Sequence, residues 1–417
     1  MEFISSKNIF LLIKDTLGMI DEHIMDHGTK VAYFVSKMLE LKGGYEKFEI
    51  ADIAILATFH DIGAYKTNDF LDMKRFEYKD FMPHSIYGYL FMKYLSPLEN
   101  LAKVLLYHHV DNKQLETFDF PYKELAAYIN IADKMDLYTD MLGEKFDTKM
   151  LKKYADTRFS REGLELFYQA EEKYNMMEKV KSEEYKKEMD DLTDYLIFTN
   201  EEKKKYLEML TYCVGFRSRD FVENEITSLC IVEELGEKMF LEDSQKEILY
   251  YGALLHDIGM LAIPAEIIDA PRNLTKQEVI CLQTHVDKAV QVLRKNSMEE
   301  DVILVVATHH ERADGTGYPR QLSDGQMTRL QKLLQIADMV TGLCHKRSYR
   351  EAKNKDEIIE ILTEETAKGR LNRPIVNIMI TFYDEIMEKV RIESENSLKM
   401  FHKLNTNYDF VSRQFPQ

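Results

Sequence analysis

The chain has 417 residues, with 55 Lys and Arg against 72 Asp and Glu, so its formal net charge is −17. This charge disfavours binding to a nucleic-acid polymer or an anionic membrane, because affinity for phosphate backbones comes mainly from clustered Lys and Arg. Only 17 Gly and 8 Pro interrupt long runs rich in Leu, Met, Glu and Lys. The composition therefore predicts an all-α protein, long enough for two or three domains.

No apolar stretch approaches the roughly 18 residues that a membrane-spanning helix needs. The N-terminal sequence MEFISSKNIFLLIK lacks the basic start and small-residue cleavage site of a signal peptide. The four cysteines are scattered without a Cys-x-x-Cys pair, which is typical of reduced core residues. We expect a cytoplasmic protein.

Residues 1–140 are predicted to form a first helical-bundle domain with a metal site. The apolar segment ADIAILATFHD (51–61) predicts a buried helix that ends in a ligand pair, and ELAAYINIAD (124–133) delivers a later Asp in the same way. His23 is a further candidate, because it shares a helix face with His27. The predicted ligands are His27, His60, Asp61, His84, His108, His109 and Asp133.

Residues 141–205 are strongly charged, with EEKYNMMEKVKSEEYKKEMDDL (171–192) at their centre. Such a charge run usually marks a solvated face, so we predict a solvated helix or helical hairpin that connects two domains, with a few Tyr, Met and Leu packing on neighbours. A homodimer or protein partner could contact this connector.

Residues 206–395 are predicted to form a second helical-bundle domain that repeats the pattern. From the middle His to the His-His pair, the spacing is 24 residues in both copies, and the other intervals differ by only four or five residues. A single His such as His285 is more often a hydrogen-bonded core residue, but two matching arrays favour metal ligands. The second set is His256, Asp257, His285, His309, His310 and Asp338.

Both sets offer imidazoles and carboxylates without thiolates, which suits iron, manganese, magnesium or hydrolytic zinc. An Asp between two His-bound cations can bridge them, and paired cations can activate water against a phosphate ester. The pattern therefore predicts metal-assisted phosphate hydrolysis.

The segment ERADGTGYPRQLSDG (311–325) is predicted to be a loop beside the second set of ligands, because Gly315, Gly317 and Pro319 favour turns. An ordinary surface turn is the alternative. Residues 396–417 form a polar tail for which the sequence suggests no function.

His256-Asp257 followed by IGMLAIP, the run His309-His310-Glu311, and DGTGYP (314–319) resemble the HD-GYP branch of the HD-domain phosphohydrolases. The resemblance spans about residues 250–352, and the first domain resembles an HD domain without the GYP loop. It implies an all-helical fold and two or three transition-metal ions, most often iron or manganese. It also implies hydrolysis of a cyclic dinucleotide, above all cyclic di-GMP, to a linear dinucleotide or GMP.

The resemblance also implies roles for individual residues. Asp257 would bridge the metals, with Asp61 as its counterpart in the first domain. The loop residues Asp314, Gly317, Tyr318 and Pro319 would shape the nucleotide pocket. Arg347 and Arg350 would contact phosphate, and a surface salt bridge is their alternative role.

Two departures from the family pattern stand out in the second domain. Met260 replaces the Lys that usually follows His-Asp-Ile-Gly, and no His precedes His256 in this domain. By the spacing of the first domain, the missing His falls at Glu223, with Asn224 and Glu225 adjacent. Glu223 is therefore the predicted substitute ligand, and a solvent-facing Glu is the alternative.

Three functions remain open from the sequence. The second domain could hydrolyse a cyclic dinucleotide, with Asp257 essential. The first domain could instead hydrolyse a nucleotide, with Asp61 essential. Alternatively, the second domain could be a degenerate receptor that binds a cyclic dinucleotide without cleaving it.

Overall fold

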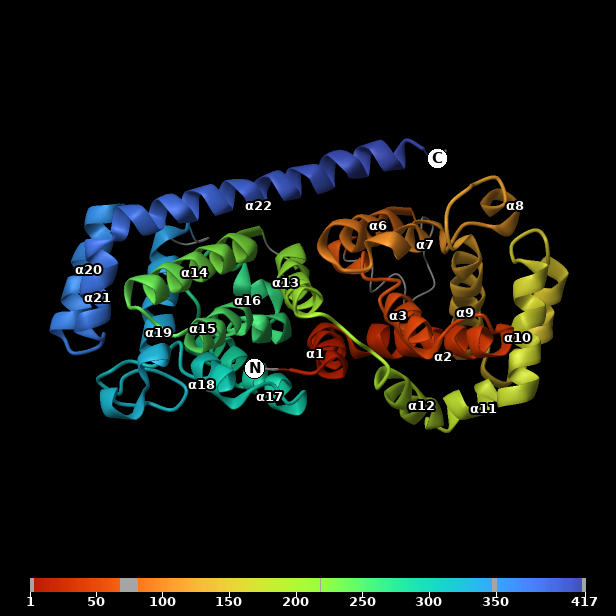
Figure 1. Ribbon diagram of the computed structural model, residues 1–417, viewed down its shortest axis with the longest axis horizontal. Helices are drawn as coiled ribbons and strands as arrows, with labels where there is room; N and C mark the ends of the chain where they lie inside the picture. Colours follow the sequence, from red (N-terminus) through yellow and green to blue (C-terminus); the bar gives the residue numbers. More distant parts are fainter. Residues whose placement is uncertain (1–3, 68–81, 218, 347–350, 415–417) are drawn as a thin grey trace. The chain divides into compact units, whose positions relative to one another are not determined.

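A computed structural model of the chain describes residues 4–67, 82–217, 219–346 and 351–414. Within these ranges the regular elements are α-helices and short 3₁₀-helices, joined by irregular segments with isolated β-bridges (Figure 1). The predicted all-α class is confirmed. Contacts divide the chain into two compact units, which we call unit N (residues 21–206 and 403–417) and unit C (residues 1–20 and 207–402).

Unit N is a helical bundle in which α2 packs on α3, α9 and α10, and α6 packs on α7. Its long helices are α2 (Glu22–Lys42), α3 (Lys47–Thr58), α6 (Met82–Leu95), α9 (Lys123–Leu142), α10 (Arg161–Tyr174) and α12 (Glu184–Thr193). Its short elements are α4 (Ala64–Thr67), η1 (Glu99–Leu101), α7 (Ala102–Tyr107), α8 (Asn112–Leu115), η2 (Gly143–Lys145), η3 (Thr148–Tyr154) and α11 (Met176–Lys181).

The central helices of unit N form where the sequence is apolar and the ends are capped. Asp21 accepts a hydrogen bond from the His23 N–H at 2.9 Å and so begins α2. Helix α3 starts with a capping box between Glu46 and Glu49, and its last six residues are all buried. The helix predicted before the first His-Asp pair is therefore present and lies in the core.

Helices α10 and α12 pack on α2, although they lie in the segment predicted to be a solvated connector. Each has one buried stripe, with Leu164, Phe167 and Ala170 on α10 and Tyr185 and Met189 on α12. Tyr185 also donates a hydrogen bond to Asp26 on α2 at 2.5 Å. Most of the charged segment is therefore part of unit N.

Unit C is a second bundle, in which α14 packs on α15 and α19, and α15 and α17 pack on α18. Its helices are α1 (Ser6–Gly18), α14 (Arg219–Lys238), α15 (Asp243–Leu255), η4 (Ile258–Ala262), α16 (Ala265–Ile268), α17 (Lys276–Lys295), α18 (Glu300–Val306), η5 (Asp324–Gln326), α19 (Arg329–Cys344), α20 (Lys355–Ala367) and α21 (Arg373–Thr381). Helices α13 (Asn200–Arg217) and α22 (Tyr383–Ser412) each cross from one unit to the other.

The two ends of the chain are not grouped as predicted. Residues 1–20 belong to unit C and not to the first domain, and residues 403–417 belong to unit N. Helix α1 belongs to unit C, where Asp15 accepts a hydrogen bond from Asn296 at 2.9 Å and pairs with Lys295 at 3.0 Å. The end of α22 belongs to unit N, where the Tyr408 ring stacks on Tyr87 at 4.5 Å. Among the described residues, no helix is both long and apolar enough to cross a membrane.

Candidate metal centres

In unit N the predicted ligands converge from five elements. His27 lies on α2, His84 on α6 and Asp133 on α9, whereas His60-Asp61 and His108-His109 directly follow the ends of α3 and α7. They form two groups, and within each group the donor atoms all lie within 4.8 Å of one another. One group is Asp61, His84, His108 and His109, and the other is His27, His60 and Asp133.

Asp61 and Asp133 each reach both groups of unit N. Asp61 Oδ2 lies 3.2 Å from His60 Nε2, and its Oδ1 lies 3.3 Å from His84 Nε2. Asp133 Oδ1 lies 3.3 Å from His27 Nε2, and its Oδ2 lies 3.5 Å from His109 Nδ1. Carboxylates in this position can bridge two cations.

Several imidazoles are oriented by a hydrogen bond on the side away from the cluster. In unit N, the Nδ1–H groups of His60 and His108 face the carbonyl oxygens of Ala57 and Leu105 at 2.8 and 2.6 Å. His27 Nδ1 instead lies 2.7 Å from the carboxylate of Asp136. Such contacts fix the tautomer, so that the Nε2 lone pair faces the centre.

The donor atoms of unit N fit a cation. His60 Nε2, His108 Nε2 and Asp61 Oδ1 are buried and have no hydrogen-bond partner among the residues that the structure describes. Buried polar atoms without a partner are costly, and a metal ion would satisfy all three. The C-terminal ends of α3 and α7 add partial negative charge beside the centre.

Unit C repeats this arrangement. His285 lies on α17 and Asp338 on α19, whereas His256-Asp257 and His309-His310 follow α15 and α18. The two groups here are His285, His309 and His310, and Glu225, His256 and Asp257. His256, His285 and His309 direct Nδ1 at the carbonyl oxygens of Ala253, Leu282 and Val306 at 2.6 to 2.7 Å.

Asp257 lies between the two groups of unit C, as Asp61 does in unit N. Its Oδ2 lies 3.6 Å from His256 Nε2, and its Oδ1 lies 3.4 Å from His285 Nε2. Asp338 likewise lies 3.8 Å from His256 and 3.2 Å from His310. The duplicated sequence pattern thus gives two clusters of the same design.

In place of the predicted Glu223, the structure brings Glu225 into a donor group with His256 and Asp257. Glu225 is buried, and its Oε1 lies 3.8 Å from His256 Nδ1. Glu223 lies instead 3.9 Å from His345. Residues two apart on a helix point about 200° apart, so only one of the two can face the cluster.

The second cluster carries an excess of negative charge. Burial raises the pKa of Glu225 to about 8, a shift that His256 opposes and that Asp257 and Asp338 increase. Burial lowers the pKa of His256, but the same three carboxylates outweigh it and raise the value to about 9. Three converging carboxylates repel one another, and a bound cation would relieve this repulsion.

The two clusters differ in exposure. In unit N, the side chains of Asp61, His109 and Asp133 are 4%, 7% and 5% exposed. Their counterparts in unit C, which are Asp257, His310 and Asp338, are 21%, 25% and 20% exposed. Of the described side chains of the two clusters, those of unit C are therefore the more accessible to solvent.

The predicted loop lies beside this exposed side, between α18 and α19 (Figure 1). The buried carboxylate of Glu311 accepts hydrogen bonds from the N–H groups of Arg320 and Leu322 at 2.6 and 2.9 Å. A Cβ on Gly317 would stand 2.3 Å from the Arg312 nitrogen, so the close turn requires glycine. Next in the chain, the Tyr318 ring packs on His310 at 4.7 Å, and Pro319 follows a cis peptide bond.

Other predicted residues lie elsewhere. His23 is exposed in the first turn of α2 and belongs to neither group of unit N, because one helical turn separates it from His27. Asp314 accepts hydrogen bonds from the Thr316 N–H and hydroxyl and pairs with Arg370 at 3.1 Å, so it braces the loop. Arg347 and Arg350 lie outside the described residues.

Sequence reasoning missed two residues of the centres. Asp136 holds His27, and its signal was its place one helical turn after Asp133. Glu311 anchors the loop, and its signal was an acidic residue beside two ligands.

Two family models, both described as the HD domain, match residues 24–138 and 209–375 and together cover more than half of the chain. The chain belongs to the HD-domain family of metal-dependent phosphohydrolases. Its second HD domain is HD-GYP-like, whereas its first lacks the GYP loop. The two metal-donor clusters lie within the two matched regions.

Relatives of this HD-domain protein are phosphodiesterases. The 3′3′-cGAMP-specific phosphodiesterase 1 of Vibrio cholerae is 23% identical over 90% of this chain and 91% of its own length. A cyclic di-GMP phosphodiesterase of Thermotoga maritima is 31% identical over 40% of this chain and 44% of its own. The crystal structure of a V. cholerae cyclic GMP-AMP specific phosphodiesterase, V-cGAP3, shares the fold, with a TM-score of 0.58, 14% identity, and 91% and 98% coverage.

Proposed function

We propose that the protein hydrolyses a cyclic dinucleotide in unit C. The observation that carries the proposal is the position of Asp257, whose two oxygens lie 3.6 and 3.4 Å from His256 and His285 in adjacent donor groups. This carboxylate is also partly exposed, beside the loop that Glu311 anchors. The arrangement suits a catalytic site that is open to a phosphodiester better than it suits a buried structural metal site.

Cations held by these two groups would supply Lewis acidity at the phosphoryl group and acidify a water molecule. The ligands would be the members of the two groups together with Asp338. The bonds from Nδ1 to backbone carbonyls hold three of the imidazoles in one tautomer before substrate arrives. Such preorganisation spares the cost of reordering them during the reaction.

The loop would position the substrate. The Tyr318 ring packs on His310 and borders the exposed side of the cluster. Its pKa is raised by burial and by the charges of Asp338 and Asp257, so the hydroxyl stays protonated and is a hydrogen-bond donor at neutral pH. Met260 has no charge with which to neutralise the phosphate, so we assign this neutralisation to the cations.

We propose 3′3′-cGAMP as the first substrate to test and cyclic di-GMP as the second. The relative that matches along nearly the whole chain is named for 3′3′-cGAMP, whereas the T. maritima cyclic di-GMP enzyme matches less than half. Both ligands share a ring of two 3′,5′-phosphodiesters, so the chemistry is the same.

The test compares Asp257→Asn with Asp61→Asn in full-length protein purified anaerobically with iron or manganese. Asp301→Asn, a change at an exposed position of unit C, is the matched control. Products from both cyclic dinucleotides and from mononucleotides are separated by chromatography. We expect Asp257→Asn to lower turnover on the order of 1,000-fold, equivalent to about 4 kcal/mol.

The remaining outcomes separate the alternatives. Loss of activity in Asp61→Asn alone would move the reaction to unit N. Binding of 3′3′-cGAMP in calorimetry without any product would make unit C a receptor.

A further inference from the structure

Unit N contains a pocket that belongs to neither metal cluster. Its volume is about 300 Å³, and it lies between the first turns of α3 and the start of α13. All of its lining residues come from residues 45–206, within unit N. A volume of this size is at the lower end of the range for small-molecule sites.

Aromatic rings form much of the wall. Tyr45, Phe48, Tyr122, Phe198 and Tyr206 all line the pocket. Phe198 and Tyr206 pack on each other at 4.6 Å, and Phe48 and Tyr122 are exposed at the rim. Ring faces carry negative electrostatic potential, so several rings around one space attract a cation.

The lining also includes three carboxylates without a basic partner among the described residues. Glu49 and Glu202 accept hydrogen bonds from the N–H groups of Glu46 and Thr199, both at 2.8 Å, so they cap α3 and α13. Asp52 is half-buried and has no hydrogen bond or ion pair with any residue that the structure describes. The pocket lining contains no Lys or Arg.

Tyr206 adds a second, independent observation. It is 2% exposed and lines the pocket, yet its hydroxyl has no hydrogen-bond partner among the described residues. Burial raises its pKa, and the charges of Asp52 and Glu202 add to the shift. Burial likewise raises the pKa of Asp52 to about 6, with Glu202 and Glu49 adding to it. Asp52, Glu202 and Tyr206 therefore face a pocket whose lining offers no positively charged side chain.

We propose that this pocket binds a small organic cation, namely an amine with a short hydrocarbon chain. The ammonium group would pair with Asp52 and donate to the Tyr206 hydroxyl, and the methylene groups would lie against the rings. A hydrated metal ion fits less well, because two of the three carboxylates already cap helices and aromatic rings form much of the remaining wall.

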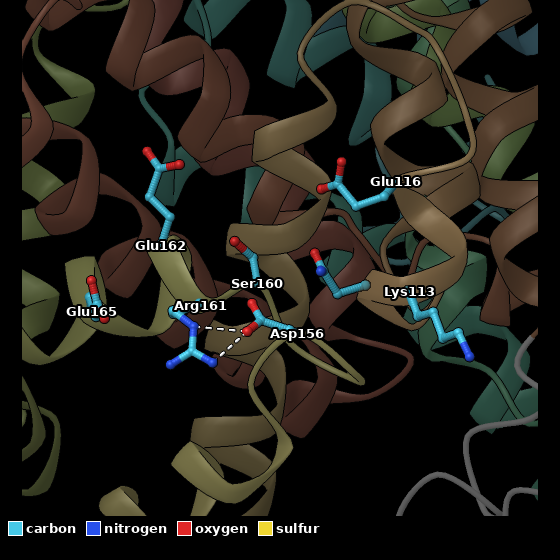
Figure 2. A pocket seen from close by; sticks show the side chains of 8 residues that line it. Lys113, Glu116, Asp156, Ser160, Arg161, Glu162 and Glu165 are labelled. Atoms are coloured by element: carbon cyan, nitrogen blue, oxygen red, sulfur yellow. Dashed lines mark hydrogen bonds and ion pairs between the residues drawn. The ribbon is translucent and has the colours of Figure 1, made fainter.

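A more open hollow in unit N lacks these features (Figure 2). Arg161 pairs with Asp156 there through two hydrogen bonds of 2.8 and 2.5 Å, so these two charges neutralise each other. Ser160 caps α10 by accepting from the Gly163 N–H at 3.1 Å. We assign no ligand to this hollow.

Calorimetric titration of the full-length protein with butane-1,4-diamine tests the proposal. Butane-1,4-diol has the same chain without charge and is the ligand control. Asp52→Asn and Tyr206→Phe test the two polar groups, and Glu178→Gln at an exposed position of α11 is the matched protein control. Thermal unfolding of each variant confirms that it folds.

We expect saturable binding of one diamine per chain and none of the diol. Asp52→Asn should weaken binding at least about tenfold, Tyr206→Phe several-fold, and Glu178→Gln not at all. Absence of saturable diamine binding up to about 10 mM would overturn the proposal. Equal binding by Asp52→Asn and the parent would overturn it as well, because the carboxylate would then not hold the ammonium. Neither outcome depends on hydrolysis in unit C.

Discussion

Gly259 lies directly against the backbone of His285. A Cβ at position 259 would stand 2.0 Å from the His285 carbonyl oxygen, and the equivalent atom on Gly63 would stand 1.9 Å from the carbonyl oxygen of His84. In both units, therefore, the glycine after His-Asp-Ile lets the segment carrying the bridging Asp touch the helix carrying the next His. This close approach brings the two ligands to one centre.

Gly259→Ala should push α17 away from the His256-Asp257 segment. We expect a loss of about 1 to 3 kcal/mol in the free energy of unfolding, together with weaker metal binding. Urea unfolding and metal analysis measure the two effects. Gly325→Ala is the control, because nothing lies within 4 Å of a Cβ there and its φ is not positive. Parental stability and metal content in Gly259→Ala would show that the helix yields without cost.

Glu225→Ala should remove one donor from the second cluster. We expect metal affinity to fall by about 10- to 100-fold, and bound metal by about one ion per chain after anaerobic dialysis. Elemental analysis gives the count. Glu223→Ala should retain the parental content, since Glu223 lies beside His345. Glu225→His should retain it too, because it restores the imidazole of the first unit. The opposite ranking of the two Glu→Ala variants would return the ligand role to Glu223.

Glu311→Ala should disorganise the loop without removing a metal ligand. The N–H groups of Arg320 and Leu322 would lose their acceptor, at a cost of about 1 to 3 kcal/mol. We expect kcat/KM for the cyclic dinucleotide to fall about tenfold or more, with metal content unchanged. Glu311→Gln keeps one acceptor oxygen and should lose less. Unchanged kcat/KM in Glu311→Ala would mean that the loop does not position the substrate.

The sequence predicts the parts of this protein in which a strong local pattern coincides with the chemistry. The apolar segment before His60-Asp61 forms a buried helix, and the duplicated His and Asp residues converge in both units. The side chains come together because a buried helix fixes where its end residues lie.

Predictions that rest on spacing or net charge alone are less accurate. Counting from His27 selects Glu223, whereas Glu225 joins the donor group. An error of two residues matters because it turns a helix position through about 200°. The charge of residues 141–205 predicts a connector with a few apolar contacts, whereas α10 and α12 pack on α2 through Leu164, Phe167 and Tyr185 and belong to unit N. A narrow apolar stripe suffices for packing and is easily hidden by charged neighbours.

The packing of α1 in unit C is not visible in sequence at all. It depends on pairs such as Asp15 with Asn296, which are more than 280 residues apart along the chain. No local pattern carries such a contact.

Asp52 should make the stability of unit N depend on pH. Its pKa is about 6 in the folded protein and 3.8 for the unperturbed group, so the folded state binds more protons between these values. Stability therefore falls as pH rises from about 4 to about 6, and the penalty persists above that range. Asp52→Asn removes the penalty. Because the side chain is partly solvated, we expect a gain of about 1 kcal/mol at pH 7.5 relative to pH 5.

Urea unfolding of Asp52→Asn and the parent at these two pH values measures the difference, and Glu178→Gln should show none. Saturating butane-1,4-diamine should stabilise the parent at pH 7.5 and stabilise Asp52→Asn less, since a ligand that binds only the folded state raises its stability in proportion to the logarithm of its affinity. A parental pH profile in Asp52→Asn would mean that the carboxylate is already neutralised by a group other than a ligand. The charge argument for the pocket would then fail with it.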